Sequence, residues 1–136
     1  MKALTIRQPC AELILQGRKQ IELREWATGH RGLLVIHAGG NVEEDACRAC
    51  SLDPATITRG AVVGVVEVVE MIAFSPQSWR DLRPLHLAPG ADPGRWTGWR
   101  LANPRRLPEP IPMSGTRGLY DLPEAIAAAV RRQLGL

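Results

Sequence analysis

The sequence predicts a mixed α+β fold, a small β-barrel of mixed strands with helices near the N- and C-termini. Strand patterns dominate the middle of the chain, most clearly GAVVGVVEVVEMIAF at 60–74, which is rich in valine and bounded by Gly60 and Pro76. The longest helical patterns lie near the two ends, at 9–16 and 123–134. The chain has 136 residues, 45% of them hydrophobic, which fits one compact domain over 1–136. So many strands in so short a chain favour a barrel.

The first elements follow from spacing and from two punctuating residues. Residues 3–6 are expected to form a short strand. Pro9 suits the first turn of a helix, because its missing N–H costs nothing there, and Gly17 suits the C-terminal cap of that helix. After Gly17 the period changes to two, which predicts a strand. One face of this strand carries four side chains: Gln20, Glu22, Arg24 and Trp26.

The remaining elements are predicted in order along the chain. We expect strands at 33–37, 60–74, 95–101 and 116–122, helices at 42–50, 78–82 and 123–134, and an extended proline-rich stretch at 103–112. The last helix presents an apolar stripe at 3.6-residue spacing, made by Ile126, Val130 and Leu134.

Composition and charge limit the classes of function. The formal net charge is +3 and the pI is about 9.1, which permits RNA, DNA or a nucleotide as partner without requiring one. We expect no membrane partner and a cytoplasmic location, because no apolar run reaches the roughly 20 residues of a membrane helix. Three cysteines are too few for a disulfide framework. Cys47 and Cys50 match half of a zinc site, so we expect neither a metal nor another cofactor, and at least one packed cysteine.

Lys19, Glu22 and Arg24 form the first candidate site. Glu22 and Arg24 share a strand face, and the long stem of Lys19 can reach that face from the start of the strand. Three alternating charges can simply be a solvated face, where ion pairs contribute little. The functional alternative is the wall of a cleft that offers cations to an anion, with Glu22 orienting them.

Glu67 is the second candidate, because it lies inside an apolar run. A buried carboxylate must be paired, protonated or open to a cavity, so Glu67 either faces a cavity or points to solvent from a one-sided strand. In a cavity shared with Lys19, the two groups would form an acid–base pair. His37 ends a strand, where a hydrogen-bonded core histidine is the simpler interpretation.

An aromatic and basic segment follows at 95–106. It contains Trp96, Trp99, Arg100, Arg105 and Arg106, a mixture that can bind single-stranded nucleic acid by stacking bases and pairing phosphates. The alternative is that the tryptophans belong to the core and the arginines are solvated around them.

The motifs resemble the ASCH domain family, the activating signal cointegrator homology domains. Its hallmark Gly-x-Lys-x-x-Glu-x-Arg is matched by GRKQIELR at 17–24, after IRQP at 6–9. RGLLVIHAG and RGAVVGVVEVVE resemble the family's later strands, and WRLANPRRLPEPIPMSGTRGLYDLP resembles its closing segment. The resemblance spans nearly the whole chain.

This resemblance implies a barrel similar to the RNA-binding PUA domain, and a cleft lined by the hallmark residues. The residues Gln8 and Pro9 are then expected to form the lip of the cleft and Glu67 its floor. RNA or a nucleotide is the expected ligand. A small branch of the family hydrolyses acetylated cytidine with a Lys, a Thr and a Glu. The Lys and Glu correspond to Lys19 and Glu67, but the Thr position holds Glu22, and a carboxylate does not replace that nucleophile. A nucleoside amidohydrolase and a protein–protein adaptor that uses 95–112 remain as alternatives.

Overall fold

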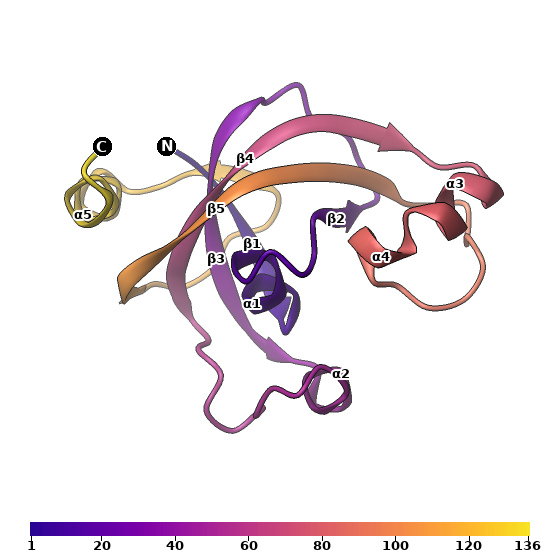
Figure 1. The fold of residues 1–136 in the computed structure, drawn as a ribbon. Helices are drawn as coiled ribbons and strands as arrows, with labels where there is room; N and C mark the ends of the chain where they lie inside the picture. Colours follow the sequence, from indigo (N-terminus) through magenta and orange to yellow (C-terminus); the bar gives the residue numbers. More distant parts are fainter.

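The computed structural model describes residues 1–136 as one curved six-stranded sheet, with α1 inside its curve and the other helices around it (Figure 1). The strands are β1 (Lys2–Gln8), β2 (Ile21–Arg24), β3 (Gly32–Val42), β4 (Ala61–Ala73), β5 (Thr97–Pro112) and β6 (Leu119–Asp121). The helices are α1 (Cys10–Leu15), α2 (Glu44–Ala49), α3 (Pro76–Asp81), α4 (Arg83–His86) and α5 (Glu124–Leu134). The predicted mixed α+β class is confirmed, with helices close to both ends of the chain.

The sheet is not closed, so the expected barrel is present only in a loose form. Its strand order is β2-β5-β4-β3-β1-β6, with β1 parallel to β3 and every other pair antiparallel. No ladder joins the two edge strands, β2 and β6, which have four and three residues. The strands curve strongly around α1, so the term barrel describes this fold only loosely (Figure 1).

Two apolar clusters lie on the two faces of the sheet. The first packs the side chains of α1, such as Ile14, against Leu34, Val66 and Trp99 on the inner face of the curve. The second packs Val130 of α5 and its neighbours against the outer face. Ile126 and Leu134 also pack against this second cluster, as expected from the apolar stripe predicted for the last helix. No helix of the structure is long and apolar enough to cross a membrane.

The glycine and proline positions largely explain the element boundaries. Gly17 adopts φ +77° directly after the turn that ends α1, as expected of a residue that stops a helix. The helix begins one residue later than predicted, because Pro9 serves as its N-cap residue. Four prolines fit within β5 because β2 pairs only with Thr97–Arg100, so the later part of β5 has an open edge where proline is tolerated.

A bulge interrupts the regular alternation of β4. The pairing of β4 shifts near Val63 with respect to both β3 and β5. Val62 and Val65 therefore belong to the outer cluster, whereas Val63 and Val66 belong to the inner one. This interruption decides the position of Glu67, discussed below.

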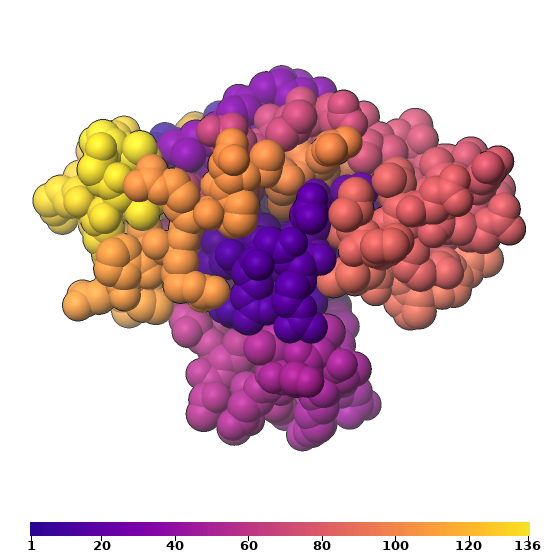
Figure 2. All heavy atoms as spheres, in the orientation of Figure 1, coloured from indigo at the N-terminus to yellow at the C-terminus, as the bar shows by residue number.

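The segment between β4 and β5 forms a separate lobe that carries α3 and α4 (Figure 2). The buried rings of Trp79 and His86 stack at 4.1 Å inside it, and Trp79 donates from Nε1 to the carbonyl of Gly90 at 3.0 Å. A backbone bond from Gln20 to the carbonyl of Leu85 then attaches α4 to the chain just before β2.

Candidate functional site

The structure brings Lys19, Glu22 and Arg24 together at the start of β2. The carboxylate of Glu22 is buried between two cations, with Oε2 3.2 Å from Nη2 of Arg24 and Oε1 3.9 Å from Nζ of Lys19. Because Glu22 and Arg24 are two residues apart on the strand, they share one face. The cluster is therefore not a solvated row of charges.

The side chain of Lys19 lies in the interior of the protein and does not line an open cleft. Its side chain is 5% exposed, and Nζ donates to the backbone carbonyl of His86 at 2.7 Å. The amine therefore joins β2 to α4 from inside the molecule. Its polar partners are this carbonyl and Glu22, so no hydroxyl group lies within its reach to act as a nucleophile.

Arg24 joins two parts of the sheet that are distant in strand order. Its Nη2 donates to the backbone carbonyl of Thr5 in β1 at 2.7 Å while contacting Glu22 of its own strand. Strands β2 and β1 are separated by three other strands within the sheet. The curvature of the sheet thus brings its two ends together, and Arg24 spans the gap between them.

A pocket of about 480 Å³ lies in this gap. Thr5 and Arg24 form one part of its wall, and the β5–β6 loop supplies the rest, Gly115, Thr116, Arg117 and Gly118. Both charged groups of the lining are guanidinium groups. Arg24 is 24% exposed, and its Nε is buried without a hydrogen-bond partner. Arg117 forms no ion pair or hydrogen bond within the protein.

A hydrogen-bonded chain behind the pocket fixes the hydroxyl of Thr5. His37 Nε2 lies 2.6 Å from the carbonyl of Met113, so this nitrogen carries the hydrogen and Nδ1 is free to accept from Thr5 Oγ1 at 3.1 Å. Burial raises the pKa of Tyr120, which keeps its proton and donates to Thr5 Oγ1 at 3.0 Å. His37 is thus a core histidine that anchors the start of the β5–β6 loop.

Gln8 and Pro9 do not line the pocket. The buried amide of Gln8 accepts from the backbone N–H of Glu12 at 2.9 Å and donates to the carbonyl of Thr58 at 2.7 Å. Pro9 is buried at the start of α1, after a cis peptide bond. The expectation that these two residues form the lip of a cleft is wrong. Both residues stabilise the first turn of α1 and its attachment to the loop before β4.

The expectation that Glu67 faces the cavity of Lys19 is also wrong. Glu67 is exposed, pairs across the sheet with Leu33 and Ala102, and accepts from Nδ2 of Asn103 at 3.0 Å. Its neighbours Val66 and Val68 point into the inner cluster, so Glu67 points outward. The solvent-facing alternative describes its position, and no acid–base pair with Lys19 forms.

The predicted nucleic-acid surface at 95–106 is not assembled either. Trp99 is fully buried, so its ring is not available for stacking on a ligand. Arg106 forms two 2.7 Å bonds to the carboxylate of Glu12, Arg105 donates to the carbonyl of Leu134, and Arg100 lies 3.6 Å from Glu70. These arginines are held by groups of the protein. Trp96 is half-buried beneath the guanidinium of Arg95, 4.6 Å from its ring.

Cys47 is buried in α2 and Cys50 follows the same helix, so the prediction of at least one packed cysteine is confirmed. Burial raises the pKa of Cys47, and burial followed by the nearby carboxylate of Glu22 raises that of Cys10 to about 11. Both thiols are therefore protonated at neutral pH.

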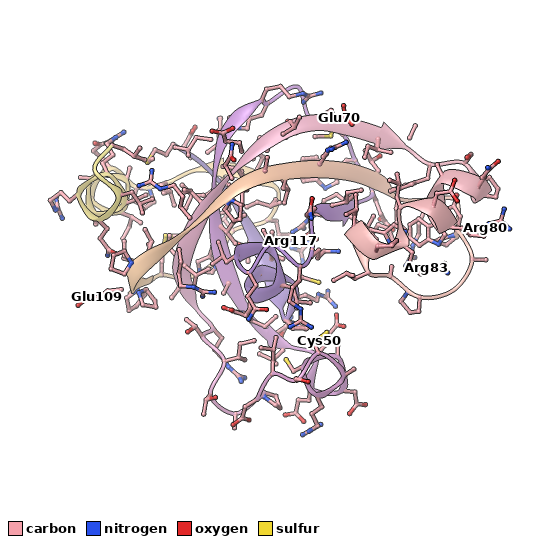
Figure 3. All side chains as sticks on the ribbon, viewed as in Figure 1. Cys50, Glu70, Arg80, Arg83, Glu109 and Arg117 are labelled. Atoms are coloured by element: carbon pink, nitrogen blue, oxygen red, sulfur yellow. The ribbon has the colours of Figure 1, made fainter.

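Thr116 and Arg117 are the pocket residues that the sequence analysis missed. The available signal was an arginine flanked by Gly115 and Gly118 in a loop, a pattern too short to single out. Figure 3 shows Arg117 near the middle of the molecule, whereas Arg80 lies at the outer end of the α3 lobe. The position of the loop depends on the pairing of β6 with β1.

A comparison with known protein families matches residues 4–111 to the ASCH domain. The chain belongs to the ASCH domain family. Members of this family have a PUA-like fold and are generally associated with RNA binding. The matched range includes Lys19, Glu22 and Arg24, and it ends before the loop that carries Arg117.

Solved ASCH structures share the fold of this ASCH domain. A crystal structure of an ASCH protein from Zymomonas mobilis superposes with a TM-score of 0.67 at 12% identity, covering 93% of this chain and 90% of that one. Two substituted variants of the same Zymomonas mobilis protein give TM-scores of 0.68 and 0.58 at 12% and 14% identity. They cover 96% of this chain in both cases, and 94% and 96% of theirs.

Proposed function

We propose that this ASCH domain binds a nucleotide unit, free or within RNA, by holding its phosphate between Arg24 and Arg117. The observation that carries the proposal is the composition of the pocket in the gap of the sheet. Its charged lining consists of two guanidinium groups, and one of them, on Arg117, has no partner within the protein.

The geometry suits an anion with several acceptor oxygens. A guanidinium group presents planar donors that match phosphate, and such charge-assisted bonds are stronger than neutral ones. Thr116, which precedes Arg117 in the same loop, adds a hydroxyl to the lining. Glu22 holds Arg24 from behind, outside the pocket lining, so the guanidinium is positioned before the ligand arrives.

The size of the pocket supports a small unit as the ligand. A volume of about 480 Å³ falls within the range of small-molecule sites and well below what a folded partner would occupy. An RNA chain would therefore place one of its nucleotides in the pocket and pass over the rim. This description agrees with the general association of the family with RNA.

The proposal is tested by equilibrium titration with adenosine 5′-monophosphate and with a short labelled single-stranded RNA at several salt concentrations. We expect binding that weakens as salt increases, and a roughly 10- to 100-fold loss of affinity in Arg117→Ala, because a charged hydrogen bond contributes about 1.5–3 kcal/mol. Arg24→Ala should lose at least as much.

Arg80→Ala is the matched control for Arg117→Ala. Arg80 is an exposed arginine that also lacks an ion pair or hydrogen bond within the protein, and it lies far from the pocket (Figure 3). If Arg80→Ala weakens binding as much as Arg117→Ala does, the affinity reflects net charge and the proposed pocket is wrong. Absence of binding at low salt also contradicts the proposal.

The two alternative functions find no support in the geometry. An amidohydrolase that uses Lys19 and Glu67 requires both groups at one substrate, and they lie on different faces of the sheet. An adaptor that uses 95–112 requires an apolar patch there, but this segment is mainly strand β5, whose Trp99, Leu101 and Leu107 are buried.

A further inference from the structure

Trp26 is an exposed aromatic residue that the pocket does not include. It follows Arg24 by two residues, and its ring contacts the ring of Trp99 at 4.9 Å. Trp99 is the cross-strand neighbour of Glu22 and lies in the inner cluster, so Trp26 faces the same side of the sheet as Glu22 and Arg24. With 37% of its surface exposed, Trp26 is the largest of the four exposed apolar residues of the chain.

The ring of Trp26 is held in place from below. The two indoles meet edge to face at an interplanar angle of 88°, and Trp99 has no exposed surface. The Nε1 of Trp99 also donates to the backbone carbonyl of Trp26 at 3.0 Å, which fixes the main chain under the exposed ring. An aromatic group anchored in this way loses little conformational entropy when a ligand stacks on it.

Trp26 also lies close to the phosphate-binding groups. Two residues of extended chain span at most about 7 Å, so its Cα lies within about that distance of the Cα of Arg24. The sugar of a single nucleotide links phosphate and base across a similar gap. Trp96 is a weaker candidate for stacking, because it is half-buried and the guanidinium of Arg95 already covers the face of its ring at 4.6 Å.

We propose that Trp26 stacks on the base of the nucleotide whose phosphate lies between Arg24 and Arg117. This inference rests on the proposed function and specifies its ligand. A base stacked on a protein aromatic ring is withdrawn from its helix, so the ligand class is single-stranded RNA with an unpaired base, and duplex RNA is disfavoured. Stacking uses the face common to all bases, so it adds affinity with little sequence preference.

The experiment compares adenosine 5′-monophosphate with ribose 5-phosphate, which carries the same phosphate and lacks the base. Calorimetric titration of both ligands is performed with the unmodified protein and with Trp26→Leu and Trp26→Phe. Leucine retains an apolar cover over Trp99 but has no aromatic face, whereas phenylalanine retains both. Thermal unfolding of each variant establishes that it is folded at the temperature of titration.

We expect the unmodified protein to bind the nucleotide more tightly than the sugar phosphate. Trp26→Leu should lower affinity for the nucleotide by roughly 5- to 100-fold, and should change affinity for ribose 5-phosphate by less than about twofold. Trp26→Phe should retain most of the affinity for the nucleotide. A residue that only covers the core would affect both ligands equally, so the difference between them measures stacking.

The outcomes separate the two proposals. One outcome is that ribose 5-phosphate binds as tightly as the nucleotide, with an affinity that Arg117→Ala lowers. In that case the phosphate pocket is supported and stacking on Trp26 is wrong. If Trp26→Leu weakens both ligands to the same extent, stacking is again wrong. If neither ligand binds the unmodified protein, both proposals fail.

Discussion

Lys19 and Arg117 show how burial assigns different roles to two residues of the same charge. The amine of Lys19 is enclosed and has its partners inside the protein, the carbonyl of His86 and the carboxylate of Glu22. The guanidinium of Arg117 lines the pocket and has no partner in the protein. A buried charge is costly when its partner is removed, whereas a free surface charge costs the fold little when it is deleted.

Lys19→Met is therefore expected to affect the stability of the protein more than its ligand affinity. Its removal leaves the buried carbonyl of His86 without its donor and takes one of the two cations from Glu22. We expect a loss of about 3 kcal/mol in the free energy of unfolding, measured with urea. Arg117→Ala should show the opposite pattern, with stability retained and affinity lost.

Lys2→Met is the control for this substitution, because Lys2 is the other lysine of the chain and forms a surface ion pair with Asp121 at 3.1 Å. Exposed pairs contribute at most about 1 kcal/mol, so Lys2→Met should change stability far less. Equal losses in the two variants would show that Lys19 has no special structural role.

The residue-scale predictions from sequence were accurate where they depended on local periodicity. The strand after Gly17 alternates as expected, which places Glu22 and Arg24 on one face. Trp26 lies beyond the end of β2, and its contact with the ring of Trp99 places it on the same side. Local periodicity could not predict the orientation of Glu67. It depends on a bulge near Val63 and on the side of the sheet that faces α1, and both result from packing between distant segments.

At the scale of elements, the lobe of α3 and α4 is organised around a neutral histidine. The Nε2 of His86 lies 2.7 Å from the carbonyl of Trp79, and its Nδ1 accepts from the backbone N–H of Ala88 at 3.0 Å. The ring therefore donates on one side and accepts on the other, which requires the uncharged form. A proton on Nδ1 would face the N–H of Ala88 and break the second bond.

The stability of the protein should consequently decrease in mild acid. Burial lowers the pKa of His86 below its ordinary value of 6.5, and the charges of Lys19 and Arg83 act in the same direction. Above about pH 6.5 the imidazole is neutral in both folded and unfolded chains, so its contribution is complete. As the pH decreases below 6.5, the unfolded chain binds the proton first, and stability is lost.

Urea unfolding at pH 7.5 and 5.5 measures this effect, with at most about 1.4 kcal/mol per pH unit expected from one proton. His86→Asn removes the titrating group, so its stability should depend less on pH in this interval than that of the unmodified protein. His30→Asn, in the loop before β3, provides the comparison. The same pH dependence in His86→Asn and the unmodified protein would contradict the assignment.

At the scale of the whole molecule, the open sheet explains why only part of the pocket lining could be predicted from the sequence. Arg24 was identified from the hallmark spacing, since that motif is local. Thr116 and Arg117 reach the pocket because β6 pairs with β1 while the curvature of the sheet brings β2 to the same place. More than ninety positions separate Arg24 from Arg117 along the chain. No periodicity in either segment specifies that approach.

A ligand in this pocket should therefore stabilise the two ends of the sheet together. It would contact Arg24 on β2 and the loop that precedes β6, which no ladder joins. With adenosine 5′-monophosphate at about 100 times its Kd, mass action adds about 2.7 kcal/mol to stability. Hydrogen-exchange mass spectrometry should show slower exchange in both 20–26 and 113–121, and Arg117→Ala should abolish both effects. Slower exchange at one end alone would mean that the ligand does not bridge the gap, and that the two guanidinium groups do not act on one phosphate.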